Sequence, residues 1–210
     1  LRFVLLMLAV FALAWAWWWG SHGHPWVAVV GVLALMFPHA PALAAEFMLV
    51  PWANRRDPVP RATMRELVSA WWNETRVGLR VFAWDQPLRS RLHPDHVPAQ
   101  AQARERRGLV LVHGFMCNRG FWNVWMPRLR ALGVPCVAVN LEPPFGSIDS
   151  YIAVIDDAVR RLREATGVAP VIVAHSMGGV ATRAWLRRAP GLEAADRVPQ
   201  KVRQTRRVDD

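Results

Sequence analysis

Charged residues are nearly missing from the first 54 positions, which contain only Arg2 and Glu46. The whole chain is 53% hydrophobic, a high fraction for a soluble domain, and the excess lies in this N-terminal stretch. A chain of 210 residues has room for one domain of ordinary size and a membrane segment, but not for two such domains. The distribution therefore predicts an apolar membrane segment followed by a single domain.

Cysteine is also scarce, since Cys117 and Cys136 are the only two. They follow no metal-binding spacing and are too few for a disulfide framework, so we interpret them as reduced or buried thiols. His93, Asp95 and His96 in "HPDH" have no further ligand types close by in the sequence. A solvated loop is therefore the prediction there, and no metal site is expected.

A continuous basic surface is not evident either, although the formal net charge is +10. The excess of arginine falls after the apolar region and in the last 14 residues, without interleaved aromatic residues or a recognisable nucleic-acid-binding module. Nucleic acid is therefore not an expected partner.

Two apolar runs fill the N-terminal stretch. Residues 3–19 carry no charge and would rise about 25 Å as a helix, near the short limit for crossing a bilayer. The second run, residues 26–50, is interrupted by Pro38, Pro41 and Glu46. We predict a transmembrane helical hairpin over residues 1–52, with the second helix at 26–47 kinked by its prolines.

The distribution of arginine predicts the orientation of this hairpin. Its loop, residues 20–25, has no Lys or Arg, whereas Arg2 precedes the first helix and four arginines follow the second, at positions 55, 56, 61 and 65. Both ends are therefore expected in the cytoplasm, on the inner side of the membrane. Tryptophans 15, 17, 18, 19 and 26 would form an aromatic belt at the outer interface.

Two alternatives for the N-terminus place the rest of the chain on the periplasmic or secreted side. One is a signal peptide with the "ALA" at 42–44 as its cleavage site, which lies unusually far from the apolar core. The other is a single membrane span.

Residues 53–107 are predicted to be a linker that contains a helix at 63–76, a strand at 77–84 and a polar loop from Gln86.

A regular pattern of strands and helices begins at residue 108. Short apolar runs at 108–114, 134–141 and 169–176 are typical of buried parallel strands, and helical patterns occupy 118–133, 147–167 and the residues after Met177. Ser147 and Gly167 are suitable caps for the second of these helices. The alternation predicts an α/β domain over residues 108–196, with helices on both faces of a parallel sheet.

Ser176, in "VIVAHSMGGV", follows the third strand directly and precedes a helix. A serine on such a sharp turn exposes its hydroxyl at the carboxyl end of the sheet. Ala174, Gly178 and Gly179 are small residues where the two backbones approach each other. The N–H of Met177, at the helix N-terminus, is a suitable donor to an oxyanion.

The first strand ends in "LVHGF", where His113 and Gly114 precede Phe115. Here the N–H of Phe115 can turn toward the same site as a second oxyanion donor. Either motif alone is compatible with an ordinary glycine-containing turn between strand and helix. Both together, in this order along the chain, favour a catalytic site.

At these residues the sequence resembles the α/β-hydrolase family, in particular bacterial lipases and esterases with "AHSMGG" and an early His-Gly loop. The resemblance covers roughly residues 105–196. It implies that Ser176 is the nucleophile, that Phe115 and Met177 form the oxyanion hole, and that His113 and His175 support the site without acting as the base. It implies lipid or small ester substrates cleaved through an acyl-enzyme, with no cofactor; related members act on thioesters or amides.

Histidine does not occur after Ser176, although the triad order in this family is Ser, then Asp or Glu, then His. The remaining acids are Glu193, Asp196, Asp209 and Asp210, none of which follows a strand pattern. Residues 197–210 form a polar tail that includes Lys201, the only lysine of the chain. A frameshift or truncation just after Arg197 would explain both this composition and the missing histidine. A disordered tail, the alternative, would explain the composition alone.

We therefore expect a partial α/β-hydrolase with impaired catalysis, whose uncovered sheet edge favours self-association. The alternative functions are a non-catalytic membrane protein with a hydrolase-like interaction module, or a transport component.

Overall fold

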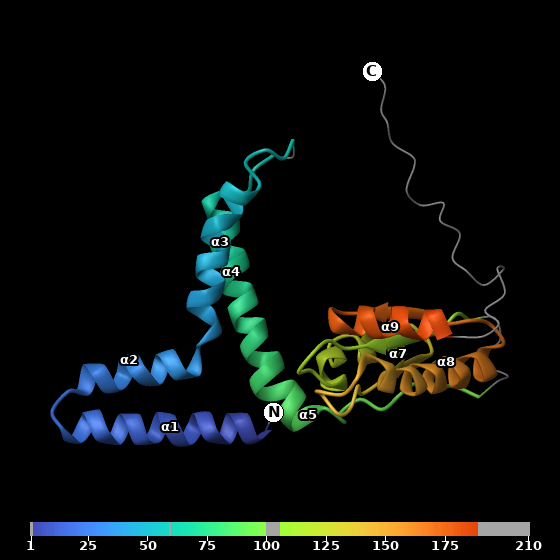
Figure 1. The fold of residues 1–210 in the computed structure, drawn as a ribbon, viewed down its shortest axis with the longest axis horizontal. Coiled ribbons are helices and arrows are strands. Elements are labelled where there is room, and N and C mark those ends of the chain that lie inside the picture. The colour runs from blue at the N-terminus through green and yellow to red at the C-terminus, as the bar shows by residue number, and fades with distance from the viewer. Residues whose placement is uncertain (1, 59, 100–105, 189–210) are drawn as a thin grey trace. The chain divides into compact units, whose positions relative to one another are not determined.

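The computed structural model describes residues 2–58, 60–99 and 106–188. The chain divides after Leu92 into two compact units. Figure 1 shows helices alone in the N-terminal unit and a sheet with flanking helices in the C-terminal unit. The tail at 197–210 and the four late acidic residues lie outside the described residues.

The N-terminal unit starts with two antiparallel helices, α1 (Arg2–Ser21) and α2 (Pro25–Met36). The indole of Trp15 donates to the carbonyl of Val27 at 3.0 Å, and Gly31 lets the same ring approach α2 closely. Helix α1 is long and apolar enough to cross a membrane, which is weak evidence for a span because it lies at the N-terminus.

The second apolar run is divided more sharply than the sequence predicts. Helix α3 (His39–Ala53) follows α2 after a bend of 70°, in place of one kinked helix over 26–47. The bend falls at Pro38, the N-cap of α3, because proline disfavours helical backbone in the residue before it. Pro41 lies in the first turn of α3, where a missing N–H removes no intrahelical bond.

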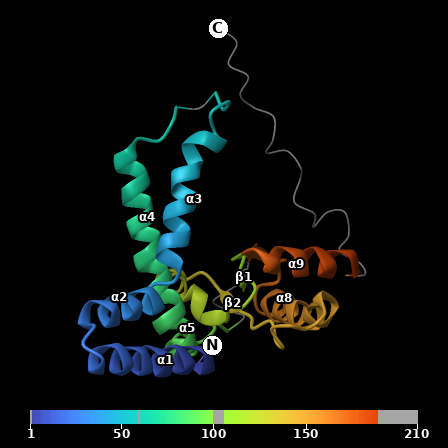
Figure 2. The same cartoon turned by 60° about the vertical axis from the view of Figure 1, so that its left-hand side comes forward.

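Helix α4 (Met64–Leu79) packs along α3, as Figures 1 and 2 both show. The ring Nε1 of Trp71 donates to the carbonyl of Ala40 at 2.9 Å, and His39 Nε2 lies 3.1 Å from the carbonyl oxygen of Thr75. These contacts join the start of α3 to the middle of α4, so the two helices form an antiparallel hairpin.

The predicted strand at 77–84 is wrong. Helix α4 continues into a π-helix, η1 (Arg80–Asp85), and then α5 (Gln86–Arg89). A capping box starts this helix, since Thr63 and Glu66 each bond the other's backbone N–H. No described strand in this unit offers a pairing partner, so the backbone bonds of 77–84 are satisfied within the helix.

The described part of the C-terminal unit contains three parallel strands, β1 (Leu109–Val112), β2 (Cys136–Ala138) and β3 (Val171–Ala174). The strand order is β2-β1-β3, which places β1 in the centre and β3 at an edge of the described sheet. The three predicted strands and the α/β class are confirmed, although each strand is shorter than its predicted run.

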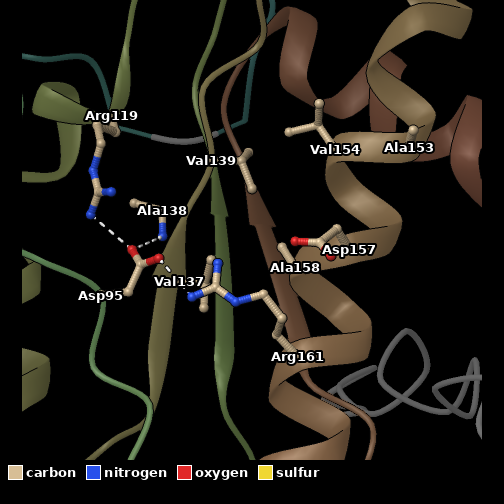
Figure 3. Close-up of a pocket in the computed structure, with 10 residues that line it drawn as sticks. All are labelled: Asp95, Arg119, Val137, Ala138, Val139, Ala153, Val154, Asp157, Ala158 and Arg161. Atoms are coloured by element: carbon tan, nitrogen blue, oxygen red, sulfur yellow. Dashed lines mark hydrogen bonds and ion pairs between the residues drawn. The ribbon is translucent and has the colours of Figure 1, made fainter.

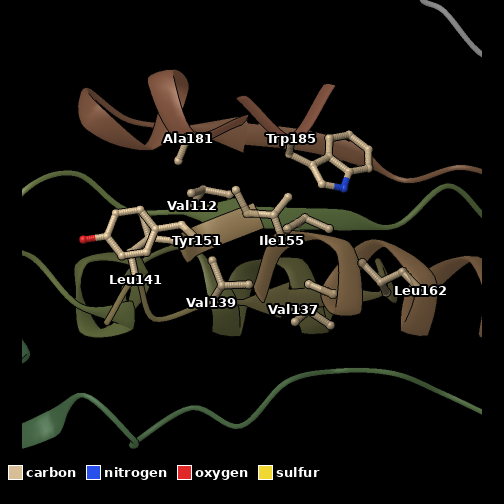
Figure 4. Packing of buried hydrophobic residues seen from close by; sticks show 11 residues of the cluster. Val112, Val137, Val139, Leu141, Tyr151, Ile155, Leu162, Ala181 and Trp185 are labelled. Atoms are coloured by element: carbon tan, nitrogen blue, oxygen red, sulfur yellow. The ribbon is translucent and has the colours of Figure 1, made fainter. Parts of the chain in front are cut away.

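Helices cover both faces of this sheet. Helices α8 (Ile152–Thr166) and α9 (Met177–Arg188) pack on one face, where the buried core in Figure 4 includes Ile155, Leu162 and Trp185. On the other face, Trp122 and Met126 pack against Leu111. Alternate side chains of β1 thus enter opposite cores, as a strand buried on both faces requires.

The helix predicted at 118–133 is interrupted. It consists of a 3₁₀ turn, η2 (Arg119–Trp122), and the short helix α7 (Met126–Ala131). The helix predicted at 147–167 is present as η3 (Ile148–Tyr151) followed by α8. Its predicted caps are confirmed: the Ser147 side chain accepts from the Asp149 N–H, and Gly167 has the left-handed φ of +77°.

The "HPDH" loop is tied to the sheet and is not freely solvated as predicted. His96 forms an antiparallel bridge with Cys136, and Asp95 accepts from Arg119 at 2.8 Å, from Arg161 at 3.3 Å and from the backbone N–H of Ala138 at 3.2 Å. Within the described ranges, no group of three His, Cys, Asp or Glu side chains is arranged to hold a metal ion.

Candidate active site

Ser176 occupies a sharp turn between β3 and α9. Its φ is +52°, in the left-handed region that a residue with a side chain rarely adopts. Helix α9 begins at the next residue, and Ser176 is exposed to solvent. Strain of this kind costs of order 1–3 kcal/mol and is concentrated at functional sites. The backbone therefore presents the serine hydroxyl at the carboxyl end of the sheet.

Two glycines bring the neighbouring backbones close to this turn. A Cβ added to Gly178 would lie 2.5 Å from the carbonyl oxygen of His113 and 2.8 Å from that of Val112. A Cβ on Gly114 would lie 3.1 Å from the Cβ of Ser176 and 2.9 Å from Nδ1 of His175. The loop after β1 and the start of α9 thus meet at Ser176. Gly179, by contrast, has open space where its side chain would be.

His113 fixes the loop that follows β1. It is buried, and its Nε2 accepts a hydrogen bond from the N–H of Leu141 at 3.0 Å. Because Nε2 is the acceptor, the proton must be on Nδ1, which donates to the carbonyl oxygen of Gly114 at 2.9 Å. One neutral imidazole therefore holds the ends of β1 and β2 together beside Ser176.

The environment favours this neutral form. Burial lowers the pKa of His113, against the opposing effects of its bond to Gly114 and the charge of Glu142. A protonated ring would also lose the acceptor that Leu141 requires. The role of His113 is thus to position the loop, with both ring nitrogens already engaged.

Two backbone donors are available beside the serine. Among the described residues, the N–H groups of Phe115 and Met177 have no hydrogen-bond acceptor. Phe115 directly follows Gly114, which approaches Ser176, and Met177 is the first residue of α9. Free N–H groups at such positions can stabilise negative charge that develops on a reacting oxygen.

No general base accompanies Ser176 in the described part of the chain. The ring of His175 stacks on Phe121 with centroids 4.8 Å apart, and both nitrogens of His113 are bonded elsewhere. The loop of His93 and His96 meets Cys136, at the amino end of β2, whereas Ser176 follows the carboxyl end of a parallel strand. The described residues thus contain an exposed serine on a strained turn and two free backbone N–H groups close to it, without a neighbouring base.

An exposed aromatic pair lies on the loops after β1 and β2. Phe145 is 81% exposed, and its ring meets that of Phe115 edge-on, with centroids 5.5 Å apart. The loop of Phe145 is tied at its base, because Pro143 accepts hydrogen bonds from the Tyr151 hydroxyl at 2.6 Å and the Gly146 N–H at 2.9 Å. Phe145 was not among the predicted residues, although an aromatic residue in the "PPFG" turn after a strand was a usable signal.

A cavity of about 440 Å³ lies between β2 and α8, away from Ser176. Figure 3 shows that its polar wall is the Asp95 carboxylate with Arg119 and Arg161, while Val137 and Ala158 are among its apolar lining residues. The two guanidinium groups already bind Asp95, so this wall is a brace between the loop, the sheet and α8.

In the comparison with protein families, residues 109–207, just under half of the chain, match the model of the alpha/beta hydrolase family. Comparison with curated proteins and with solved structures found no match. The matched region contains the whole described sheet, Phe115, Ser176 and Met177. The C-terminal unit thus has an alpha/beta hydrolase fold with a three-stranded parallel sheet and flanking helices.

Proposed function

We propose that the C-terminal unit is a serine hydrolase in which Ser176 attacks a carboxylic ester. The observation that carries this proposal is the positive φ of Ser176 at the junction of β3 and α9, beside the close approach of Gly114. Attack by the serine oxygen on the ester carbonyl forms a tetrahedral oxyanion, and expulsion of the alcohol leaves an acyl-enzyme. The N–H groups of Phe115 and Met177 stabilise that oxyanion, each worth roughly 3–4 kcal/mol in such sites.

The aromatic pair of Phe115 and Phe145 favours a substrate ester that carries an apolar group, as in lipases and carboxylesterases. Both rings lie on loops at the end of the sheet where Ser176 is exposed, and Phe145 leaves most of its surface uncovered. Burying that surface against an apolar substrate group is favourable by about 25 cal/mol per Å². Truncation of Phe145 should therefore weaken turnover of long-chain esters more than that of acetates.

Catalysis in this chain is proposed to be slow. Without a base to take the proton of Ser176, attack on an ester loses several orders of magnitude, while oxyanion stabilisation and binding retain a residual rate. An interaction module of the same fold is the second candidate, and the observation that favours it is the absence of a base among the described residues.

A fluorophosphonate probe distinguishes these two functions. The full chain in lipid nanodiscs is incubated with the probe for minutes to hours, beside Ser176→Ala and the exposed-serine control Ser147→Ala. We expect slow labelling that Ser176→Ala abolishes and Ser147→Ala leaves unchanged. A folded chain that shows no labelling of Ser176 above the Ser176→Ala background would overturn the hydrolase proposal in favour of the interaction module.

The N-terminal unit is proposed to anchor the hydrolase to the bacterial inner membrane through α1 and α2. The support is the 20-residue apolar helix α1, with Phe3 and Leu13 each 72% exposed, and the arginines that favour a cytoplasmic C-terminal unit. Carbonate extraction of membranes tests the anchor, and protease protection of inside-out vesicles tests the side. Release by carbonate would contradict the anchor.

Self-association is proposed to occur through β3, an edge strand in the described sheet. Its Val171 is 39% exposed and Ala174 is exposed, whereas β1 is almost fully buried. Such an edge can pair with the same strand of a second copy. Ala174→Lys should lower the oligomer fraction in sedimentation experiments, relative to Ala42→Lys on α3; equal fractions would contradict this contact.

A further inference from the structure

The N-terminal unit contains a hairpin that a simple two-span anchor does not explain. Helix α1 rises about 30 Å, enough for the hydrocarbon core of a bilayer, whereas the antiparallel α2 rises only about 18 Å before the chain bends by 70°. If α1 is perpendicular to the membrane, α3 leaves α2 within about 20° of the membrane plane. The bend lies in the half of the bilayer where α1 begins, about 12 Å short of the level of Arg2.

The end of α4 and α5 reaches that same level. Arg2, at the start of α1, donates from Nε to the carbonyl oxygen of Pro87 in α5 at 2.5 Å. One end of the α3–α4 hairpin is thus close to the membrane-surface end of α1, where an arginine is expected to contact headgroups. If α1 crosses the bilayer, the bend and this bond together put the hairpin near the surface where α1 begins.

The hairpin exposes apolar residues that no described residue covers. On α3 these include Met48 and Trp52, 70% and 66% exposed, and on α4 they include Met64, Val68 and Trp72, at 68%, 55% and 58%. Leu49 of α3 and Val77 of α4 are also exposed, at 58% and 49%, on other faces of the two helices. On α4, Leu67, Trp71 and Thr75 lie on the side that packs against α3. Val68 and Trp72 each follow one of these residues, about 100° further around the helix, and so lie on one flank of α4. On α3, Met48 and Trp52 lie about 180° and 220° around the helix from His39, which contacts α4, so both point away from α4. We call Met48, Trp52, Met64, Val68 and Trp72 the apolar side.

Charge is distributed to suit an interface. Glu46, the only acidic residue of α3, is about 200° from Met48 around the helix and so points away from the apolar side. The guanidinium of Arg55 lies over the Trp52 ring, 4.6 Å from its centroid, and Arg65 follows Met64, the first residue of α4. Tryptophan with arginine is the side-chain combination that favours the headgroup region of a membrane.

We propose that the α3–α4 hairpin lies in the interface of a phospholipid bilayer, with the apolar side toward the acyl chains and Arg55 and Arg65 among the phosphates. This inference rests on the proposed insertion of α1. It assigns α3 to the membrane surface and not to a second crossing, and it connects the anchor to the hydrolase unit through a helix parallel to the membrane.

Fluorescence quenching of single-cysteine variants tests the proposal. In full-length chains with Cys117→Ser and Cys136→Ser, a small fluorophore is attached at Val68→Cys on the apolar side, or at Ala70→Cys, exposed and about 200° away. Leu13→Cys on α1 reports insertion of the first helix. The proteins are reconstituted in phosphatidylcholine–phosphatidylglycerol vesicles with brominated lipid in the membrane or iodide in the water.

We expect severalfold stronger quenching by brominated lipid at position 68 than at 70, and the reverse order with iodide. Equal iodide quenching at 68 and 70, with position 13 quenched by lipid, would overturn the interface position while leaving the anchor intact. Iodide quenching at position 13 would instead overturn the anchor and, with it, this proposal.

Discussion

The two units use apolar residues in opposite ways. In the N-terminal unit, the buried apolar residues among those described are only Ala12, Ala28, Leu67 and Pro87, while its large side chains are mostly exposed. In the C-terminal unit, Val110, Leu111 and Val112 are fully buried between helices on both faces. Hydrophobicity alone therefore does not identify a core, because apolar side chains can be satisfied by lipid as well as by protein.

The largest expected effect is on the closed core. Leu162 is fully buried in α8, and Leu162→Ala should destabilise the C-terminal unit by about 2–5 kcal/mol through lost burial and the cavity left behind. Leu132→Ala, at a position 71% exposed, should change it by less than about 0.5 kcal/mol. Urea unfolding of full chains in nanodiscs, followed by hydrogen exchange in α8 peptides, measures both. Similar losses for the two variants would remove the contrast between core and surface.

A smaller effect is expected at the brace around Asp95. Its carboxylate is 17% exposed and binds Arg119 and Arg161, so Asp95→Asn should cost about 2–3 kcal/mol by leaving two guanidinium groups without their anion. Asp157→Asn removes a surface ion pair with Arg160, in which both partners are half exposed, and should cost under about 1 kcal/mol. Thermal unfolding of the two variants should separate them; a larger loss for Asp157→Asn would contradict the assignment of Asp95 as the brace.

The two glycines after Ser176 offer a matched pair. Gly178→Ala forces a methyl against two backbone carbonyls and should destabilise the unit by about 1–3 kcal/mol and lower fluorophosphonate labelling. Gly179→Ala enters open space in a helix and should stabilise it by about 0.5–1 kcal/mol with labelling retained. Denaturation midpoints and labelling rates check both. Equal behaviour of the two variants would show that α9 is not held against the end of β1.

The sequence predicted the C-terminal unit better than the N-terminal one. The strands of the sheet, the caps Ser147 and Gly167 and the turn at Ser176 follow from local patterns, because short apolar runs and glycines leave few conformations open. The strand predicted at 77–84 failed because alternation indicates a strand only where a neighbour can pair with it, and here a capped helix continues.

Contacts between distant residues could not be predicted. The bond from Leu141 to His113 and the meeting of Phe115 with Phe145 join loops that only the folded sheet brings together. The prolines indicated that the second apolar run would bend, but not that α3 would turn by 70° and pack against α4. The contrast between buried apolar residues in the C-terminal unit and exposed ones in the N-terminal unit thus depends on tertiary contacts that the local sequence does not specify.

The smallest predicted effect concerns the proton on His113. Burial keeps its pKa in the folded protein below the value of about 6.5 in the unfolded chain, so the unfolded state binds more protons near that pH. The contribution of His113 to stability is therefore complete above about pH 6.5 and is lost as the pH falls through the folded pKa.

The variant His113→Gln tests this dependence, because it keeps an acceptor for the Leu141 N–H without a titrating group. Urea midpoints of both proteins between pH 5 and about 8 should diverge only on the acid side, with the native chain losing more. Parallel curves would show that this imidazole does not couple protonation to the loop that holds Phe115 beside Ser176.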